Sequence, residues 1–548
     1  MIGMGSEFRR DERANMSILF AFGFTISALV SAVAVDAASL YQERRLLQAG
    51  VDLAAIAAAA EPSRAVEIVQ TVLVGARLLA PASMDGLTVV TGRYDPAPAL
   101  IADRFTPGGL PANAVSVTLE RPGTLYFAGG LIETPRLHAA GIASVTPEVS
   151  FSLGSRLASL NGGLANEVLS RLLGTTVSLS IADYTALAAA RIDTLLLLDA
   201  VGQRIGVTAG TYDHLLAMDA RSGTVAAALA SLTTGAARTA LNAIAGGGAG
   251  HAVPLSKLAR LGQLGGLQVG SGSSSGFALS ALETLVATAS VADGDRQASV
   301  NLAASVPGLV SLKLDLAIGE RPQGAAWFAA GPPGTMVRTA QVRMRIKADM
   351  LGGSALLGAG VSLPLWLDLA QSEAQVVSAS CPSVAAPRGS ARLAVLPGAA
   401  RLGLGTLSDA ALNDFAAPVP HGATVLINAL VLRISASAQV NVAQTAPIQL
   451  DFSSAEIAAG TVKTARTTTP VASLAGSLLG TLDLTVSVLG IGLSPPATFA
   501  QALRNLLAPM APTLDLTISG ALAALGLGVG EADVRVYGVR CDRAVLVG

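Results

Sequence analysis

The chain has 548 residues, of which 51% are hydrophobic, 13% charged and 4% aromatic, and its formal net charge is −1. This length accommodates roughly two to four domains. The balanced charge and the lack of a basic stripe argue against nucleic acid as a partner. Ordinary globular chains carry about 25% charged residues, so the low charged fraction predicts cores built from small aliphatic side chains.

An uncharged stretch near the start divides the sequence. Residues 1–13 form an arginine-containing leader, and no charged residue occurs from Ala14 to Val35. As a helix this stretch would measure about 33 Å, enough to cross a bilayer core of about 30 Å. Polar residues return at Asp36, but the apolar character continues. Residues 14–60 are therefore predicted to form one transmembrane and stalk helix.

Three interpretations of this stretch compete. A signal anchor explains its length and its lack of a helix breaker. A cleaved signal peptide is the second, because Ala32-Val33-Ala34 has the small-x-small pattern of a cleavage site, although the apolar run exceeds the usual 7–15 residues. The third is a buried helix of a soluble protein, in which so long an uncharged run is rare. Arginine is slightly more frequent before the span than after it, with Arg9, Arg10 and Arg13 against Arg44 and Arg45. This small excess weakly favours a cytoplasmic N-terminus.

The rest of the chain is predicted to be α+β. Residues 61–150 form a small α+β region, with a helix at 64–79 and period-two strands at 87–93 and 113–120. Residues 151–250 form a helical domain or insert, which includes the segment SRLASL at 155–160. Residues 251–285 read as a Gly/Ser-rich linker with a short helix.

Residues 286–548 are predicted to be β-rich, in one or more sandwich-like antiparallel domains, because short alternating runs are separated by turn residues. Arg343, Arg345 and Lys347 alternate with apolar residues, which predicts a solvated sheet face. A weak repeat suggests duplicated units of a short helix followed by a strand, and chance similarity is the alternative. Its copies are LLGTLDLTVS (478–487), TLDLTIS (513–519) and, more loosely, LLGTTVSLS (172–180).

The two cysteines, Cys381 and Cys541, both lie far beyond the span. If that part of the chain is exported, an oxidising compartment allows them to pair. The closed loop would then stabilise the fold by roughly 4–5 kcal/mol at most. Two unrelated buried thiols are the alternative.

No motif predicts catalysis, a cofactor or a metal site. The four histidines, at positions 138, 214, 251 and 421, show no ligand spacing. Gly272–Gly276 has the G-x-S-x-G pattern with Ser274 at its centre, but it lies in a Gly/Ser run and not between a strand and a helix. Asp483 and Asp515 are predicted inside strands, facing solvent or capping a neighbour. The chain is therefore expected not to be an enzyme.

A more specific pattern extends over about 50 residues at the start of the chain. It combines the arginine-rich leader, the run NMSILF, Val35-Asp36, the run RLLQA and the run DLAAIAAAA. This pattern resembles the TadG-like proteins of the tight-adherence (Flp) pilus machinery. The matching positions are Arg9, Arg10, Asn15, Asp36, Gln48 and Asp52.

Two departures from that family refine the expectation. Pilin-type leaders are cut after a glycine and have glutamate at the fifth following position, where this chain has Ala14 and Leu19. An uncut anchor is therefore expected. Many TadG-like proteins carry a von Willebrand A domain with an Asp-x-Ser-x-Ser metal motif. The nearest match, DFSS at Asp451, departs from it, so no metal site is carried over.

The resemblance implies a bitopic protein of the bacterial inner membrane, with its N-terminus cytoplasmic and its bulk periplasmic. Its partners would be the lipid bilayer and pilus-assembly or envelope proteins, with no nucleic acid and no cofactor; no oligomeric state is predicted. The alternatives are a secreted structural or adhesive envelope protein with a cleaved signal peptide, and an envelope hydrolase that uses Ser274.

Overall fold

The computed structural model divides the chain into two compact units. The anchor unit comprises residues 1–147, 380–387 and 540–548, and the large unit comprises residues 148–379 and 388–539. The structure describes residues 12–548 except 155–161, 272–274, 293–296, 303–308, 320–325, 352–359, 421, 429–431, 468–472, 489–490, 494–500, 502, 504, 506, 526 and 542. Several positions singled out from the sequence lie outside these residues: Arg9, Arg10, the segment SRLASL, Ser274 and His421.

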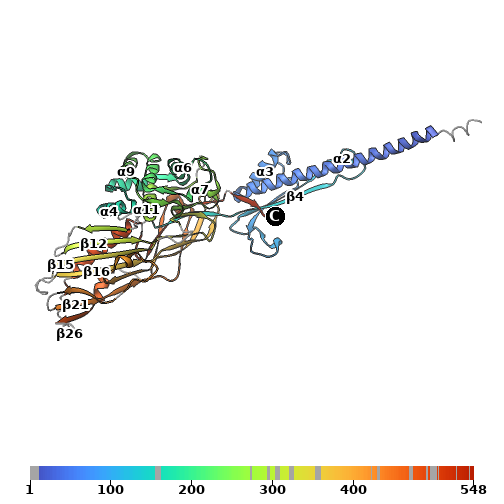
Figure 1. Ribbon diagram of the computed structural model, residues 1–548. Helices are drawn as coiled ribbons and strands as arrows, with labels where there is room; N and C mark the ends of the chain where they lie inside the picture. Colours follow the sequence, from blue (N-terminus) through green and yellow to red (C-terminus); the bar gives the residue numbers. More distant parts are fainter. Residues whose placement is uncertain are drawn as a thin grey trace, which may run out of the picture. The chain divides into compact units, whose positions relative to one another are not determined.

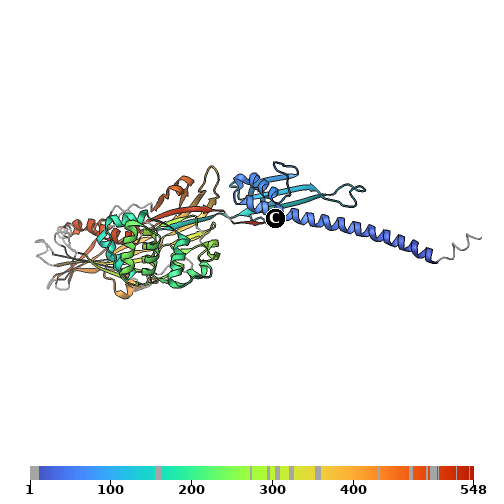
Figure 2. The same ribbon diagram turned by 90° about the horizontal axis from the view of Figure 1, so that it is seen from above.

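One long helix, α2 (Glu12–Ala59), dominates the anchor unit, as the hydropathy pattern predicts. Pro62 ends it and begins the turn η1 (Pro62–Arg64), after which α3 (Ala65–Gly75) follows. The half of α2 up to Val35 extends beyond the rest of the unit (Figures 1 and 2). In the other half, buried residues recur every three or four positions, which places them on one face. They include Asp36, Leu47, Val51, Ala54 and Ala58.

That face packs on an antiparallel sheet with the order β2-β1-β3-β4-β28. Its core joins α2 and α3 to alternate residues of the central strands, such as Val115, Val117 and Leu119. The elements are β1 (Leu87–Tyr94), η2 (Ile101–Asp103), β2 (Phe105–Pro107), β3 (Ala114–Pro122), β4 (Arg136–Val145) and β28 (Ala544–Leu546). The strand prediction for 87–93 and 113–120 is confirmed.

The large unit begins with β5 (Glu148–Leu153) and continues into a helical region. Figure 1 shows its helices on one side of strands β12, β15 and β16. Ser180 and Ser280 begin α5 and α11 with capping boxes. The helices are α4 (Gly162–Leu173), α5 (Ile181–Ala189), α6 (Thr194–Ile205), α7 (Tyr212–Leu216), α8 (Ser222–Ser231), α9 (Gly235–Gly246), α10 (Leu255–Leu258) and α11 (Ala281–Val291).

Short strands and a turn lie between these helices. They are β6 (Arg191–Asp193), β7 (Asp219–Arg221), β8 (Ala252–Pro254), β9 (Ala259–Arg260), η3 (Gly262–Gly266) and β10 (Ala278–Ser280). The region 251–285, expected to be a linker with a short helix, thus contains β8, α10, β9, η3 and β10, and α11 begins within it.

The remainder of the large unit is rich in antiparallel strands, as predicted. Its main sheets have the orders β11-β12-β15-β16-β19-β22, β24-β27-β5-β13-β9, β14-β17-β18-β23 and β20-β21-β25-β26. The first strands are β11 (Gln297–Leu302), β12 (Leu309–Ile318), β13 (Phe328–Gly331), β14 (Met336–Arg338), β15 (Val342–Leu351), β16 (Gly360–Leu369), β17 (Glu373–Ser380), β18 (Ser390–Leu396) and β19 (Ala400–Leu404).

The later strands alternate with short helices. These elements are α12 (Asp409–Asn413), β20 (Thr424–Asn428), β21 (Leu432–Ser437), β22 (Gln439–Val442), β23 (Ile448–Phe452), α13 (Ser454–Ala459), β24 (Val462–Arg466), α14 (Leu474–Gly480), β25 (Asp483–Val488), β26 (Ile491–Leu493), η5 (Ala508–Met510), α16 (Ala511–Ala523) and β27 (Glu531–Arg540).

The prediction that Arg343, Arg345 and Lys347 lie on a solvated face of β15 is wrong for two of the three. Arg343 is 3% exposed, and its guanidinium donates to Asp368 and to the carbonyl oxygens of Ala411, Asp414 and Ala417. Arg345 similarly donates to Asp315 and to a carbonyl of the same covering segment. A segment around α12 therefore covers this face and takes up the charges. Lys347 remains 57% exposed.

The weak repeat does not form duplicated helix–strand units. The first copy does place α14 before β25, but the second copy lies inside α16. There Leu514, Ile518 and Ala521 are buried at helical spacing. Asp515 is thus on a helix and not on a strand, and its carboxylate accepts the backbone N–H of Ala475 at the start of α14. Asp515 therefore caps a neighbouring helix. Capping a neighbour was one of the two roles expected for it from the sequence, and facing solvent was the other.

Candidate membrane-anchoring site

The first half of α2 is long and apolar enough to cross a membrane. Its most apolar stretch of 18 residues has a mean hydropathy of 2.3, and none of it is buried against the protein. Exposed side chains include Phe20, Phe24 and Leu29, at 76%, 67% and 64%. The core helix of a soluble protein would cover such residues with other protein atoms. The structure therefore disfavours the interpretation as a buried helix.

Asp36 follows this apolar half directly and contacts the turn between β3 and β4. It is 4% exposed. Its carboxylate accepts the backbone N–H groups of Tyr126 at 2.7 Å, Phe127 at 3.2 Å and Ala128 at 2.8 Å, all in the turn between β3 and β4. We call this contact the Asp36 latch. Burial alone would raise the pKa of Asp36, but these N–H donors outweigh it and hold the pKa below its usual value.

Further contacts continue the latch along the same face of α2. The carboxylate of Glu43 accepts the backbone N–H of Thr124 at 3.0 Å. One turn beyond, the Gln48 amide donates to the carbonyl oxygen of Ala140 on β4 at 2.8 Å and to the Asp52 carboxylate at 2.7 Å. The helix and β4 therefore run alongside one another, with polar contacts from Asp36 to Asp52.

A glycine on β4 leaves room for the carboxylate of Asp52. A Cβ atom at Gly141 would lie 2.8 Å from an oxygen of Asp52, closer than real Cβ atoms come to such neighbours. Of the motif positions chosen from sequence, Asp36, Gln48 and Asp52 thus share one docking face. Asn15 belongs to α2, and its side chain is not described. Sequence reasoning missed the partners on the β3–β4 hairpin because most of them contribute backbone atoms.

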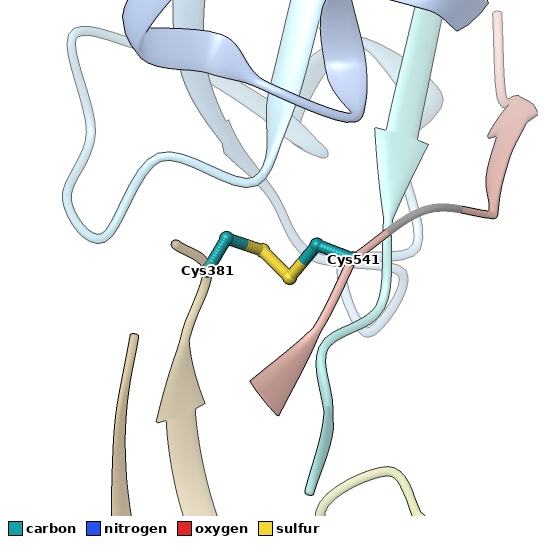
Figure 3. Close-up of a disulfide and its surroundings, with 2 residues drawn as sticks. All are labelled: Cys381 and Cys541. Carbon is teal, nitrogen blue, oxygen red and sulfur yellow. A yellow bond between two sulfur atoms is a disulfide. The ribbon is translucent and has the colours of Figure 1, made fainter. Parts of the chain in front are cut away.

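A disulfide joins Cys381 to Cys541 in the anchor unit (Figure 3). The Cα–Cα distance of 5.7 Å lies within the normal range for a disulfide. Cys381 belongs to the short return 380–387, and Cys541 precedes β28, which pairs with β4. Within the anchor unit, the bridge therefore joins the return 380–387 to the segment that leads into β28. Of the two alternatives expected from the sequence, the structure shows the one in which Cys381 and Cys541 are paired.

A cavity of about 480 Å³ in the large unit is the other polar feature of note. Arg191, Arg535 and Tyr537 contribute to its lining. The buried Glu283 lies beside them and forms an ion pair with Arg535 at 3.0 Å. Burial, together with the negative charge of Glu283, raises the pKa of Tyr537. Glu283 also lies 3.9 Å from Arg191, so its carboxylate has two guanidinium groups as neighbours in this network.

Metal ligands do not gather anywhere in the part of the chain that the structure describes. No group of three or more His, Cys, Asp or Glu side chains is arranged to hold an ion there. Next to the undescribed Ser274, the hydroxyl of Ser275 donates to the carbonyl oxygen of Phe277 at 2.8 Å and contacts Asp193 at 2.9 Å. These bonds hold Ser275 beside Asp193, the residue that caps the start of α6.

Comparison with known families gives two matches. Residues 37–143 match a family model described as "putative Tad-like Flp pilus-assembly". This range begins one residue after Asp36 and contains the docked half of α2, α3, β1 to β3 and most of β4. Residues 161–290 match a domain of unknown function (DUF8293), which covers the helical region of the large unit. No curated protein and no solved structure matches the chain.

Proposed function

We propose that this chain is a bitopic inner-membrane protein that serves assembly or anchoring of a Flp-type pilus, as a TadG-like protein. The observation that carries the proposal is α2 itself. Its exposed apolar half has the length of a membrane span, and its docked half lies in the region that matches the Tad-like pilus-assembly family. The mechanism is binding without catalysis.

The proposed topology places the N-terminus in the cytoplasm. The part of the anchor unit that follows Val35 and the whole large unit then lie in the periplasm. Arginines in the leader support this orientation through the positive-inside rule. The Cys381–Cys541 disulfide supports it independently, because such bonds persist in oxidising compartments and are rare in the cytosol. In this position α2 fixes the protein beside the assembly platform, and the β-rich large unit meets pilus or envelope partners.

A chromosomal deletion tests the proposal. Cells that lack the chain should lose surface pili, and the full-length chain should restore them. A matched version with a cleavable signal peptide before Val35 exports the same units without the anchor, and it should not restore pili. Pili that remain at normal numbers in the deletion strain would refute the assignment to pilus assembly.

One observation favours a second candidate, an exported structural or adhesive envelope protein. Cleavage after Ala34 would remove only the exposed half of α2 and would leave Asp36 and the whole docking face intact. This candidate predicts a mature chain that begins at Val35 and an exported protein without an anchor.

A further inference from the structure

The turn between β3 and β4 exposes an unusual set of large apolar side chains. Residues 123–132 (GTLYFAGGLI) contain no charge, and Glu133 ends the run. Tyr126 and Phe127 are 67% and 60% exposed, and Leu131 and Ile132 are 83% and 58% exposed. Single exposed apolar residues are ordinary on soluble proteins, but four in one turn form a patch that calls for a partner. We call these four side chains the turn patch.

The latch contacts fix where this turn lies along α2. Thr124 is held at Glu43, whereas Tyr126 and Ala128 are held at Asp36. Glu43 and Asp36 are seven residues apart, or about 10 Å along a helix. The turn therefore advances along α2 toward the exposed apolar half and reaches its boundary. Figures 1 and 2 both show the β3–β4 hairpin beside α2 with its turn directed that way.

We propose that the turn patch is a second membrane contact, which enters the interfacial region of the leaflet facing the exported units. The inference rests on the proposed function, in that α2 must span the bilayer. The partner of the turn patch is then the bilayer itself, because a bilayer that surrounds residues 14–35 ends where the turn patch begins. Tyrosine is enriched at the membrane interface, and the apolar Phe127, Leu131 and Ile132 suit the adjoining hydrocarbon.

The Asp36 latch makes this position chemically acceptable. A carboxylate at the edge of the hydrocarbon is costly unless donors surround it. Here three backbone N–H groups of the turn supply the donors, and the same bonds satisfy turn backbone that would otherwise face lipid. Asp36 is thus a positioning residue, which holds the turn patch at a fixed depth and limits the tilt of α2.

The opposite end of the sheet offers a matched control. Leu87 pairs with Leu119 at the end near the turn, whereas Gly92 pairs with Ala114 at the far end. Leu100 lies in the connection beyond that far end and is 68% exposed. It has the same side chain and a similar exposure to Leu131, without the proposed membrane contact.

The test uses the full-length chain in vesicles of phosphatidylethanolamine and phosphatidylglycerol. Leu131→Cys, Leu100→Cys and Ile26→Cys variants are labelled with an environment-sensitive fluorophore, since both native cysteines are in the disulfide. Lipids that carry a quencher at the headgroup or in the acyl chain report depth. We expect the Ile26 label to be quenched by acyl-chain quenchers and the Leu131 label by headgroup quenchers, each several-fold more than the Leu100 label.

The outcomes separate the two claims. Quenching at position 26 with none at position 131 above the Leu100 control would overturn the membrane contact and leave the anchor in place. No quenching at position 26 would overturn the anchor. Protection of the Leu131 label that rises with protein density, without quenching by lipid, would assign the patch to a second copy and overturn the inference. In Asp36→Ala, the Leu131 signal should fall several-fold while the Ile26 signal stays unchanged.

Discussion

The docking of α2 on the sheet can be tested with two neighbouring leucines. Leu47 is 1% exposed in the core of the anchor unit, whereas Leu46 is 56% exposed on the other side of the helix. Leu47→Ala removes the equivalent of about three methylene groups, at about 0.8 kcal/mol each, and leaves a cavity. The expected cost is therefore about 2–5 kcal/mol. Leu46→Ala should change stability by no more than about 0.5 kcal/mol.

Amide hydrogen exchange measures this cost in the full-length protein without requiring the two units to unfold together. Each 1.4 kcal/mol corresponds to a factor of ten, so the central amides of β3 and β4 should exchange roughly 30-fold to several-thousand-fold faster in Leu47→Ala. The Leu46→Ala amides should match wild type. Equal acceleration in both variants, or none in Leu47→Ala, would refute docking through this face.

Three further predictions address burial, the disulfide and pH. Arg343→Met should destabilise the large unit by about 3–5 kcal/mol in urea, measured by fluorescence of the tryptophans in that unit. Three backbone carbonyl oxygens lose their buried donor, although Asp368 keeps Arg401 as a partner. Lys347→Met is the exposed control, and equal effects would contradict the covered face. Replacing Cys381 and Cys541 together by serine should lower the stability of the anchor unit by up to about 5 kcal/mol, because the loop spans 160 residues; an unchanged thermal midpoint would contradict this. The backbone N–H donors hold the pKa of Asp36 in the folded protein below its usual value of 3.8, so the stabilisation is complete above pH 3.8 and is lost as the pH falls through the lower folded value. Exchange of the three turn amides should accelerate only there, and acceleration near neutral pH would contradict the latch.

Hydropathy, proline positions and strand alternation were sufficient to predict much of the fold. The uncharged run predicted α2, Pro62 marked its end, and period-two runs located β1 and β3. These signals succeed because they report which residues of an element are buried, and that pattern repeats at short intervals along the sequence. The β-rich character of residues 286–548 follows from the same signal.

The failures have physical causes. Alternation at Arg343 and Arg345 identifies a sheet face, but it does not indicate that a segment about 70 residues later covers it. The segment TLDLTIS fits a strand pattern, yet it is helical because the residues around it bury at intervals of three and four. At the anchoring site, Asp36 was chosen by resemblance. Its partners are backbone N–H groups, which every turn possesses and no side-chain pattern reveals.

The N-terminus of the mature protein tests the central claim most directly. Mass spectrometry of the chain purified from the membrane fraction should find peptides from residues 14–35 still attached to the docked half of α2, in protein that resists alkaline extraction. A mature chain that begins at Val35 and is released by alkaline extraction would contradict the anchor.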